Sequence, residues 1–321
     1  VRALDAGGTT WSTPVTVVGT GIVGLYASVA VVNGNPAISY YDSLNAALKY
    51  VRALDANGLT WGAPVTLDSD TSGNVGSYTS LAVVNGYPAV CYYDLANADL
   101  KYVRATDASG TSWSIPDPLD SAGSVGLYTS LAIVNGNPAI SYYDDTNGDL
   151  KYLWAMDASG TSWRTPLTLD STGIVGKYTS LAIVNGSPAI SYYDSANGGL
   201  KYMRALDVTG ASWGTPVFLD STGDIGQHTS LAVVDGHPAI TYYDNTNHDL
   251  KYAGALDVNG TNWAAPVAID VVGDVGQYTS LTVANGIANV SFYDVTNGNL
   301  RWASITSGDL DHDGLLDSWE L

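Results

Sequence analysis

The chain has 321 residues, of which 45% are apolar and 13% charged, and this is enough to bury a large core. Its 31 acidic residues outnumber its 12 basic ones and give a formal charge of −19, which argues against nucleic acid or an anionic membrane as a partner. Cys91 is the only cysteine, so an intrachain disulfide is excluded, and no apolar run approaches the ~18 residues of a membrane-spanning segment. We therefore expect no membrane insertion.

The sequence repeats itself six times. Residues 128–152 read YTSLAIVNGNPAISYYDDTNGDLKY, and residues 178–202 agree with them at 21 of 25 positions. A YYD or FYD motif marks each copy at intervals of 52, 50, 50, 50 and 50 residues. The aspartates that end these motifs are Asp42, Asp94, Asp144, Asp194, Asp244 and Asp294.

One copy contains the signals of four strands. In the third copy the first strand is expected at 130–134, followed by Asn135-Gly136, the preferred type I′ hairpin turn, and a second strand at 138–144. A loop then leads to a third strand at 150–157, and a turn at 158–162 leads to a fourth at 163–170. No segment shows a sustained 3.6-residue period, so helices are not expected.

The first strand of each copy is apolar at nearly every position, which requires cover on both faces. Four-stranded sheets arranged radially provide that cover, because each sheet packs its faces on its neighbours. We therefore predict an all-β fold, a six-bladed β-propeller with four antiparallel strands per blade. A β-solenoid is the alternative, although its rungs are usually shorter.

The two ends of the repeat predict how the last blade is completed. The sixth copy ends at 298–306 without a fourth strand, whereas residues 10–18 offer a fourth strand without a blade. We expect this N-terminal strand to complete the last blade, although residues 1–5 and 303–307 compete for one strand position. The propeller domain is predicted at 1–305, and 306–321 at the start of a further domain. The chain opens within a repeat, so we expect it to belong to a longer protein.

The repeat YTSLA…NG.P.ISYYD..NGDLKY resembles that of tandem-repeat propellers from bacterial and archaeal extracellular proteins. The resemblance covers residues 1–305 and implies a secreted or cell-surface location, but no activity. By architecture alone the chain is also similar to lectins built as six- or seven-bladed propellers, which implies sugar sites between blades.

Residues 309–320, DLDHDGLLDSWE, carry the spacing of a calcium loop. Ca²⁺ binds six to eight hard oxygen ligands, the loop's glycine allows a sharp turn, and its last glutamate can bind through both oxygens. The predicted ligands are Asp309, Asp311, Asp313, Asp317 and Glu320 through their side chains and Leu315 through its carbonyl. The loop resembles the single calcium loops of dockerins and bacterial thrombospondin-type-3 repeats, which also implies an extracellular protein. An acidic tail without bound metal is the alternative.

Two sets of repeated residues are predicted to share one face of the propeller. The first set precedes the first strands: Tyr26, Tyr78, Tyr128, Tyr178, His228 and Tyr278. The second set is the six motif aspartates, each followed three residues later by an asparagine. An aromatic face beside acid and amide groups is what a sugar site needs. The alternative is structural, because Asp-x-x-Asn-Gly is ordinary turn chemistry and tyrosine also serves packing.

Catalysis needs groups with different roles, which near-identical blades do not supply. His228 and His248 of the fifth copy, with Asp244 or Asp249, are the exception that could bind a metal or act as acid and base. We expect no enzyme. The conserved tryptophan of each fourth strand is predicted to anchor neighbouring blades, and the lysine of each third strand to neutralise nearby carboxylates.

The preferred function is therefore non-catalytic, multivalent binding of a glycan or another cell-surface ligand by an adhesive, lectin-like module. A structural or adhesive spacer with no small-molecule site is the main alternative, and an enzyme acting on polysaccharides is the third.

Overall fold

Blades of antiparallel strands make up the protein. The computed structural model describes residues 1–5, 10–69 and 73–305. In these residues every regular element is a β-strand. The 23 strands form six antiparallel sheets, and each sheet consists of strands that follow one another in the chain. The fold is an all-β six-bladed β-propeller, as the fifty-residue repeat predicts. Contacts divide the chain into two compact units, Val1–Ser171 and Thr172–Leu321, each with three blades.

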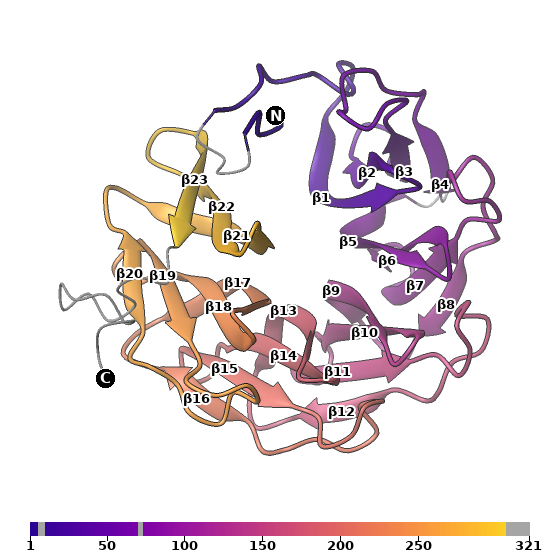
Figure 1. Cartoon of the computed structure of the whole chain (residues 1–321). Helices are drawn as coiled ribbons and strands as arrows, with labels where there is room; N and C mark the ends of the chain where they lie inside the picture. The colour runs from indigo at the N-terminus through magenta and orange to yellow at the C-terminus, as the bar shows by residue number, and fades with distance from the viewer. Residues whose placement is uncertain (6–9, 70–72, 306–321) are drawn as a thin grey trace. The chain divides into compact units, whose positions relative to one another are not determined.

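The first unit holds blades one to three, coloured from indigo to magenta in Figure 1. The first blade consists of β1 (Val23–Val32), β2 (Asn35–Asp42), β3 (Ala47–Arg52) and β4 (Val65–Ser69). The second consists of β5 (Val75–Val84), β6 (Tyr87–Asp94), β7 (Asp99–Arg104) and β8 (Asp117–Asp120). The third consists of β9 (Val125–Val134), β10 (Asn137–Asp144), β11 (Asp149–Trp154) and β12 (Leu167–Asp170). The first strands are neighbours, since β1 contacts β5 and β5 contacts β9.

The second unit holds blades four to six. The fourth blade consists of β13 (Val175–Val184), β14 (Ser187–Asp194), β15 (Gly199–Arg204) and β16 (Val217–Asp220). The fifth consists of β17 (Ile225–Val234), β18 (His237–Asp244), β19 (Asp249–Gly254) and β20 (Val267–Asp270). The sixth consists of β21 (Val275–Ala284), β22 (Ile287–Asp294) and β23 (Asn299–Ile305).

The last blade differs from the expectation, because its sheet has three strands among the described residues. The expected fourth strand at 10–18 does not form: Trp11 makes an isolated bridge to Ala3, as the equivalent tryptophans of the other copies do to their own alanines. Residues 1–5 and 303–307 were expected to compete for one strand position of this blade. Residues up to Ile305 occupy it, since Ile305 ends β23 and pairs with Ala288 of β22. The third-strand position of the sixth blade thus belongs to the C-terminal segment.

The hairpin between the first two strands forms as the sequence predicts. Asn135 and Gly136 have φ angles of 47° and 83°, and a type I′ turn needs positive φ at both of its central residues. The first strand itself begins earlier than expected, at Val125 rather than at 130. A bulge interrupts its pairing with β10 between Leu127 and Ser130 and allows the strand to continue past the irregularity.

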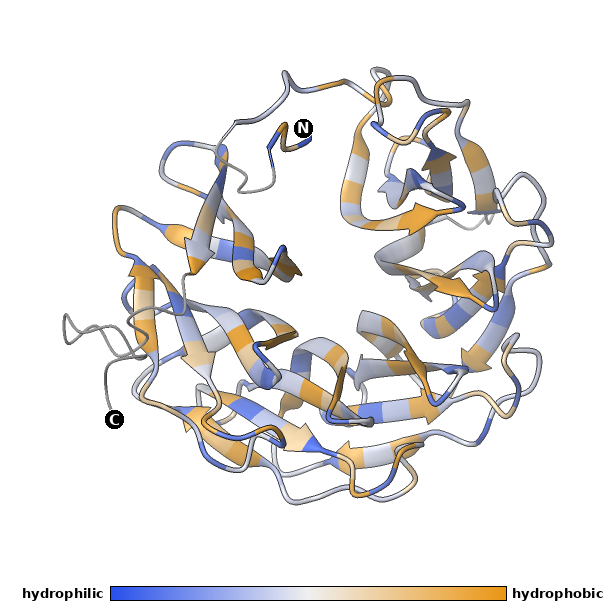
Figure 2. Cartoon of the chain, in the orientation of Figure 1, coloured by the Kyte–Doolittle hydropathy of each residue, from blue (hydrophilic) through white to orange (hydrophobic). Residues whose placement is uncertain are grey.

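The core lies between neighbouring blades of each unit. Leu48 and Tyr50 of the first blade pack with Val75, Val90 and Tyr92 of the second in one buried cluster. Hydrophobic residues occur along the strands of every blade (Figure 2). Each strand can therefore be apolar on both faces, because a sheet of the next blade covers it. No helix among the described residues is long and apolar enough to cross a membrane.

A glycine at the start of the first strand permits this close packing. Gly126 has a φ of 105°, and a Cβ atom there would lie 2.7 Å from the Cα atom of Leu100 in the preceding blade. The predicted tryptophan anchor is also observed within the first unit. The Trp113 ring meets the Tyr50 ring edge-on at 5.0 Å, and its Nε1 donates to the carbonyl of Gly110 at 2.8 Å. The anchor therefore joins blade two to blade one.

Candidate functional site

The six aromatic positions lie at the bulge of each first strand. Their φ angles fall between 53° and 55°, in the left-handed region, where a bulky residue is strained by about 1–3 kcal/mol. Glycine would be free of that strain, yet none of the six copies has it. The residues form two groups, which we call the first aromatic row (Tyr26, Tyr78 and Tyr128) and the second aromatic row (Tyr178, His228 and Tyr278).

The rings of each row touch one another. In the first row the Tyr78 ring lies 4.5 Å from that of Tyr26 and 4.6 Å from that of Tyr128, centroid to centroid. In the second row the His228 ring lies 4.4 Å from that of Tyr178 and 4.3 Å from that of Tyr278. Each row is therefore a continuous aromatic surface rather than a set of separate rings.

The rows remain accessible to solvent. Tyr26 is 42% and Tyr278 66% exposed, and the four other members are partly buried. The sequence therefore correctly places aromatic side chains together, but it does not reveal that they also support each other through ring contacts.

Threonine and serine of the YTS motif link the rows to neighbouring blades, a role that the sequence reasoning missed. Thr129 donates its hydroxyl to the carbonyl of Tyr78 at 2.5 Å, and the amide of Leu131 donates to Ser80 Oγ at 3.0 Å. The same two bonds recur from blade four to five and from five to six. The available signal was that the serine recurs in all six copies and the threonine in all but the first, where Ala27 replaces it. These bonds fix the spacing between consecutive rings.

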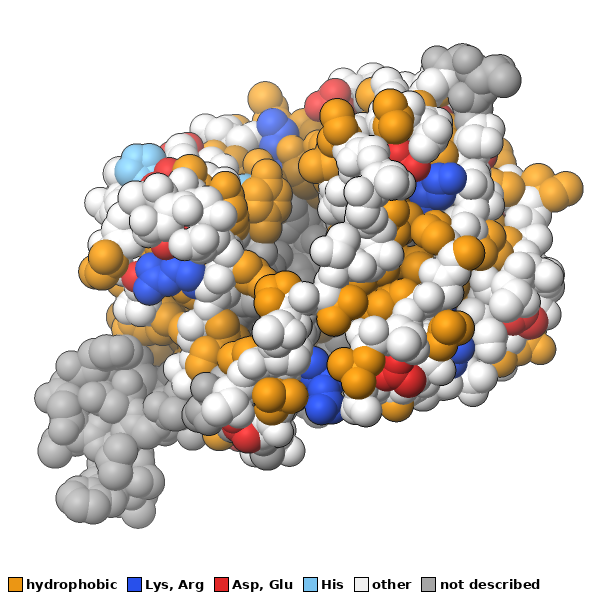
Figure 3. Space-filling view, turned by 90° about the horizontal axis from the view of Figure 1, so that it is seen from above, with side chains coloured by type: hydrophobic (Ala, Val, Ile, Leu, Met, Phe, Trp, Pro, Cys, Tyr) orange, Lys and Arg blue, Asp and Glu red, His pale blue; other side chains and the backbone are white. Residues whose placement is uncertain are grey.

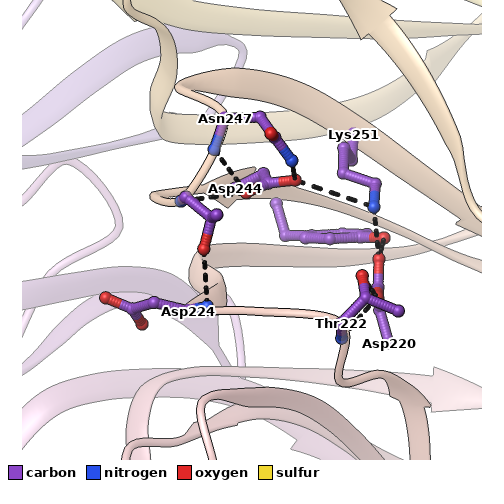
Figure 4. Close-up of polar contacts among 8 residues, drawn as sticks. Asp220, Thr222, Asp224, Asp244, Asn247 and Lys251 are labelled. Atoms are coloured by element: carbon purple, nitrogen blue, oxygen red, sulfur yellow. Dashed lines mark hydrogen bonds and ion pairs between the residues drawn. The ribbon is translucent and has the colours of Figure 1, made fainter.

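The six motif aspartates are buried, with exposed fractions of at most 5%. In the fifth blade Asp244 Oδ1 accepts from the amides of Thr246 and Asn247 at 3.0 Å each, and Oδ2 accepts from Asn247 Nδ2 at 2.9 Å (Figure 4). Asp42, Asp94, Asp144, Asp194 and Asp294 hold their own asparagines in the same way. The Asp-x-x-Asn pair therefore closes the loop between the second and third strands.

A lysine joins each of several motif aspartates to an aspartate of the preceding blade. Lys151 Nζ lies 3.1 Å from Asp144 Oδ2 and 2.9 Å from Asp120 Oδ2, and Tyr142 donates its hydroxyl to Asp120 at 2.7 Å. All four side chains are buried. Figure 4 shows the equivalent contacts of Lys251. The predicted neutralisation of carboxylates by lysine is thus observed, although it occurs in the protein interior and between blades.

These contacts determine the ionisation of the buried groups. Burial by itself would raise the pKa of Asp144, but hydrogen bonds from Asn147 and Lys151 outweigh it and hold the pKa below 3.8. Burial would likewise lower the pKa of Lys151, but its bonds to Asp120 and Asp144 keep it above 10.5. Both groups are therefore charged at neutral pH. The two charges pair with each other inside the protein.

Polar groups at the links between blades lie beside the aromatic rows, and the sequence reasoning missed them as well. In the first unit the Tyr41 hydroxyl donates to Asn74 Oδ1 at 2.6 Å. In the second unit Asp224 accepts from the Tyr193 hydroxyl, from Gln227 Nε2 at 3.2 Å and from Asn245 Nδ2 at 2.7 Å. The link position varies among the copies, and this variation was the signal that could have pointed to it.

The link meets the adjacent loop, since the amide of Asp224 (labelled in Figure 4) donates to Thr246 Oγ1 at 2.7 Å. Asn245 is exposed, and Asp224 and Gln227 are partly exposed. These three side chains can therefore offer amide and carboxylate groups to a ligand at this face, whereas the motif aspartates are enclosed.

His228 and His248 of the fifth blade are not placed to bind one metal ion together. The His228 ring lies between the aromatic members of its row, and burial lowers its pKa to about 4. His248 Nδ1 lies 2.8 Å from the Tyr243 hydroxyl and 3.9 Å from Asp274 Oδ2. Asp244 is occupied by its loop. Among residues 1–5, 10–69 and 73–305 no group of three or more His, Cys, Asp or Glu side chains is placed to hold a metal ion.

The predicted calcium ligands cannot be placed, because they lie outside the described residues. They are Asp309, Asp311, Asp313, Leu315, Asp317 and Glu320. Cys91 is fully buried, at the position where the other copies carry serine or threonine, and burial raises its pKa to about 12.

No family model and no curated protein sequence matches the chain. Solved structures do resemble it. A Hadza microbial sialidase is 16% identical, with a TM-score of 0.59 over 88% of this chain and 65% of its own. YCF48 bound to a D1 peptide is 14% identical, with a TM-score of 0.60 over 94% and 83%. An exo-β-1,3-galactanase from Phanerochaete chrysosporium with β-1,3-galactotriose is 12% identical, with a TM-score of 0.50 over 90% and 68%.

The chain thus spans about two thirds of the length of the sialidase. At these identities the likeness shows the propeller fold, and the fold is shared by glycosidases and by a peptide-binding protein. Function has to be inferred from the side chains of this chain.

Proposed function

We propose that the chain is a non-catalytic extracellular module that binds glycans, or a glycan-covered surface, through its aromatic rows. The observation that carries the proposal is the strained backbone of six aromatic residues, which recurs in every blade although glycine would relieve the strain. Contact with a ligand is a reason to keep an aromatic side chain at such a position. The ring faces would stack on the C–H surface of sugars.

The polar partners of the sugar differ from the sequence prediction. Asp244 and its five equivalents shape the loops, because their carboxylates are buried and hydrogen-bonded there. The groups that would meet sugar hydroxyls are those beside the rows: Asn74 in the first unit, and Asp224, Gln227 and Asn245 in the second. The six aspartates thus support binding indirectly, by positioning the links and loops that carry these groups.

Repetition favours a multivalent ligand. Each aromatic row presents three rings, and a shallow contact at each ring would be weak alone. Linking several weak contacts on one polymer raises the overall affinity by factors of 10²–10⁴. Most of the side chains visible in the view of Figure 3 are uncharged. Stacking on the rings and hydrogen bonds to the polar groups beside them are the contacts that the rows would offer, and a polysaccharide or a cell-surface glycan is the partner they suit.

A structural spacer is the second candidate. It is favoured by the contacts of the motif aspartates, whose carboxylates are already satisfied by asparagine and lysine side chains without any ligand. A spacer would still fold and would show no change in binding when the rings are removed, whereas a glycan-binding module would lose affinity. Substitution of the rings therefore distinguishes the two functions.

The test is a glycan array probed with the chain and with the double variant Tyr78→Gly/Tyr128→Gly. Glycine suits the φ angles of 53° and 55° at these positions, so the variant should fold. We expect its array signal to fall about tenfold or more, since two of three rings in the first row are lost. Phe218→Thr is the matched control: it removes a 45% exposed aromatic side chain from β16 and installs the residue of three other copies. Its binding should equal that of the wild type.

We also propose that the C-terminal loop binds one Ca²⁺ through Asp309, Asp311, Asp313, Asp317, Glu320 and the carbonyl of Leu315. The spacing of the oxygen donors supports this site. An extracellular location would supply calcium at the concentration that even a weak single loop requires. The proposed location and partners therefore agree with the metal site.

A further inference from the structure

A second candidate site lies at the opposite ends of the strands, between blades two and three. A cavity of about 500 Å³ is bounded by the end of β7, the residues that enter β8, and the loop between β11 and β12. Its lining includes Tyr102, Arg104, Thr106, Asp117 and Thr161. This volume lies in the range of sites for small ligands. The aromatic rows belong to the other end of the first strands, so this cavity is separate from the proposed glycan surface.

The same niche occurs at the start of the chain with a different lining. There a cavity of about 320 Å³ is lined by Arg2, which is equivalent to Arg104, and by Val15, which is equivalent to Asp117. The apolar Val29 and Val31 of β1 also line it. The repeat therefore creates the niche, and the residues of each copy decide its chemistry.

Blade two departs from the other copies at three positions of this niche. Thr106 replaces a leucine or methionine found at Leu4, Leu54, Met156, Leu206 and Leu256. Asp117 replaces a valine or leucine found at Val15, Val65, Leu167, Val217 and Val267. Ile115 replaces a small residue found at Thr13, Ala63, Thr165, Thr215 and Ala265, and its side chain is 90% exposed. Blade two therefore places an exposed isoleucine beside a carboxylate that the other copies lack.

Two residues of opposite charge, Arg104 and Asp117, line the niche. Arg104 is fixed in place, since Nε donates to the carbonyl of Val84 at 3.0 Å and Nη2 to that of Asn85 at 3.2 Å, while its guanidinium lies 4.6 Å from the centre of the Tyr87 ring. Its Nη1 group has no partner among the described residues. The Asp117 side chain is exposed and likewise has no hydrogen bond or ion pair there.

We propose that this niche binds a small zwitterion of the amino-acid type with an apolar side chain. Arg104 would receive the carboxylate of the ligand and Asp117 its ammonium group, while Ile115 would contact the apolar side chain. A purely anionic ligand would face Asp117 and a chain of charge −19, and a purely cationic ligand would leave Arg104 unused. A ligand with both charges satisfies both groups. The free amino acid and the short peptide share this chemistry.

The test uses the δ1 methyl group of Ile115 as a reporter in methyl NMR spectra of the whole chain, assigned with the variant Ile115→Thr. The probes are leucine, dileucine, N-acetyl-leucine without the ammonium charge, and leucine amide without the carboxylate. We expect leucine or dileucine to shift the Ile115 signal with saturation at a Kd on the order of 1 mM. The two single-charge analogues should bind about tenfold more weakly. A larger affinity for leucine identifies the free amino acid as the source, and a larger affinity for dileucine a peptide.

Asp117→Val installs the residue of three complete sister blades and should therefore fold. It should weaken binding of the zwitterion about tenfold and should not weaken binding of N-acetyl-leucine, because that anion no longer faces the Asp117 carboxylate. Tyr78→Gly/Tyr128→Gly should leave the Ile115 shift intact, so failure of the glycan proposal is distinguishable from failure of this one. Absence of a shift with both zwitterions at about 100 mM would overturn the proposal. An equal response to glucose or to inorganic phosphate, or no effect of Asp117→Val, would overturn it as well.

Discussion

Lys151→Met removes the charge that holds Asp120 and Asp144 together. Each carboxylate oxygen lies about 3 Å from Lys151 Nζ, so the two are at most about 6 Å apart once the lysine is gone. At an effective dielectric constant of about 20, two unit charges at that distance repel by about 3 kcal/mol. Because both carboxylates are buried, water does not replace the lysine, and a loss of about 3–5 kcal/mol in the free energy of unfolding is expected.

Equilibrium unfolding in guanidinium chloride, followed by tryptophan fluorescence, measures this loss at pH 7. Lys49→Met is the matched control, because Lys49 Nζ bonds to Thr66 Oγ1 at 2.6 Å and occupies the same position in the first blade. The control should cost less than about 1 kcal/mol. The loss at Lys151 should also shrink as the pH falls below 7, because protonation of either carboxylate in the variant removes the repulsion between them. Equal effects of both substitutions at pH 7 would show that the buried cluster does not stabilise the blades.

Three further predictions follow from the same geometry. Gly126→Ala should lower the free energy of unfolding by about 2 kcal/mol or more beyond the loss caused by Gly136→Ala, as measured by chemical denaturation. The new Cβ atom would meet a neighbouring backbone at Gly126, whereas nothing lies within 4 Å at Gly136. Equal losses would refute the close approach. His228→Tyr, the residue of the other copies, should reduce the loss of stability on acidification from pH 6.5 to 4. The lowered pKa of His228, about 4, gives stability that is full above 6.5 and is lost as the pH falls through 4; unchanged pH dependence would argue against burial of this ring. Calcium titration of the chelator-treated chain should give about one bound ion, and Asp311→Ala should abolish it; binding that survives the substitution would place calcium elsewhere.

The sequence predicts much of the fold because its strongest signals are local and repeated. The turn at Asn135-Gly136 forms as predicted, since these two residues accept positive φ. The bulge before it was missed, because tyrosine normally favours extended backbone and nothing in Tyr128 itself predicts a φ of 55°. The fourth strand was predicted from 163 but begins at Leu167, because Trp163 pairs with Ala155 and Pro166 has no N–H to donate.

The candidate site was predictable only in part. The bond from Asp144 to Asn147 spans three residues, so turn chemistry revealed it. The partner of Lys151, in contrast, is Asp120, which lies 31 residues earlier in another blade. The contacts between Tyr78 and its neighbouring rings also depend on the packing of blades and on strained backbone. Pairings of this kind arise from tertiary structure, which the pattern of a single repeat does not specify.

The most direct test of the central claim is the glycan array with the wild type, Tyr78→Gly/Tyr128→Gly and Phe218→Thr side by side at millimolar calcium. Binding of one glycan class by the wild type and by Phe218→Thr, with about a tenfold or greater loss in the double glycine variant, is the result that the aromatic rows predict. A wild-type chain that binds no glycan at any density, or a folded double variant that binds as well as the wild type, would contradict glycan recognition by the rows.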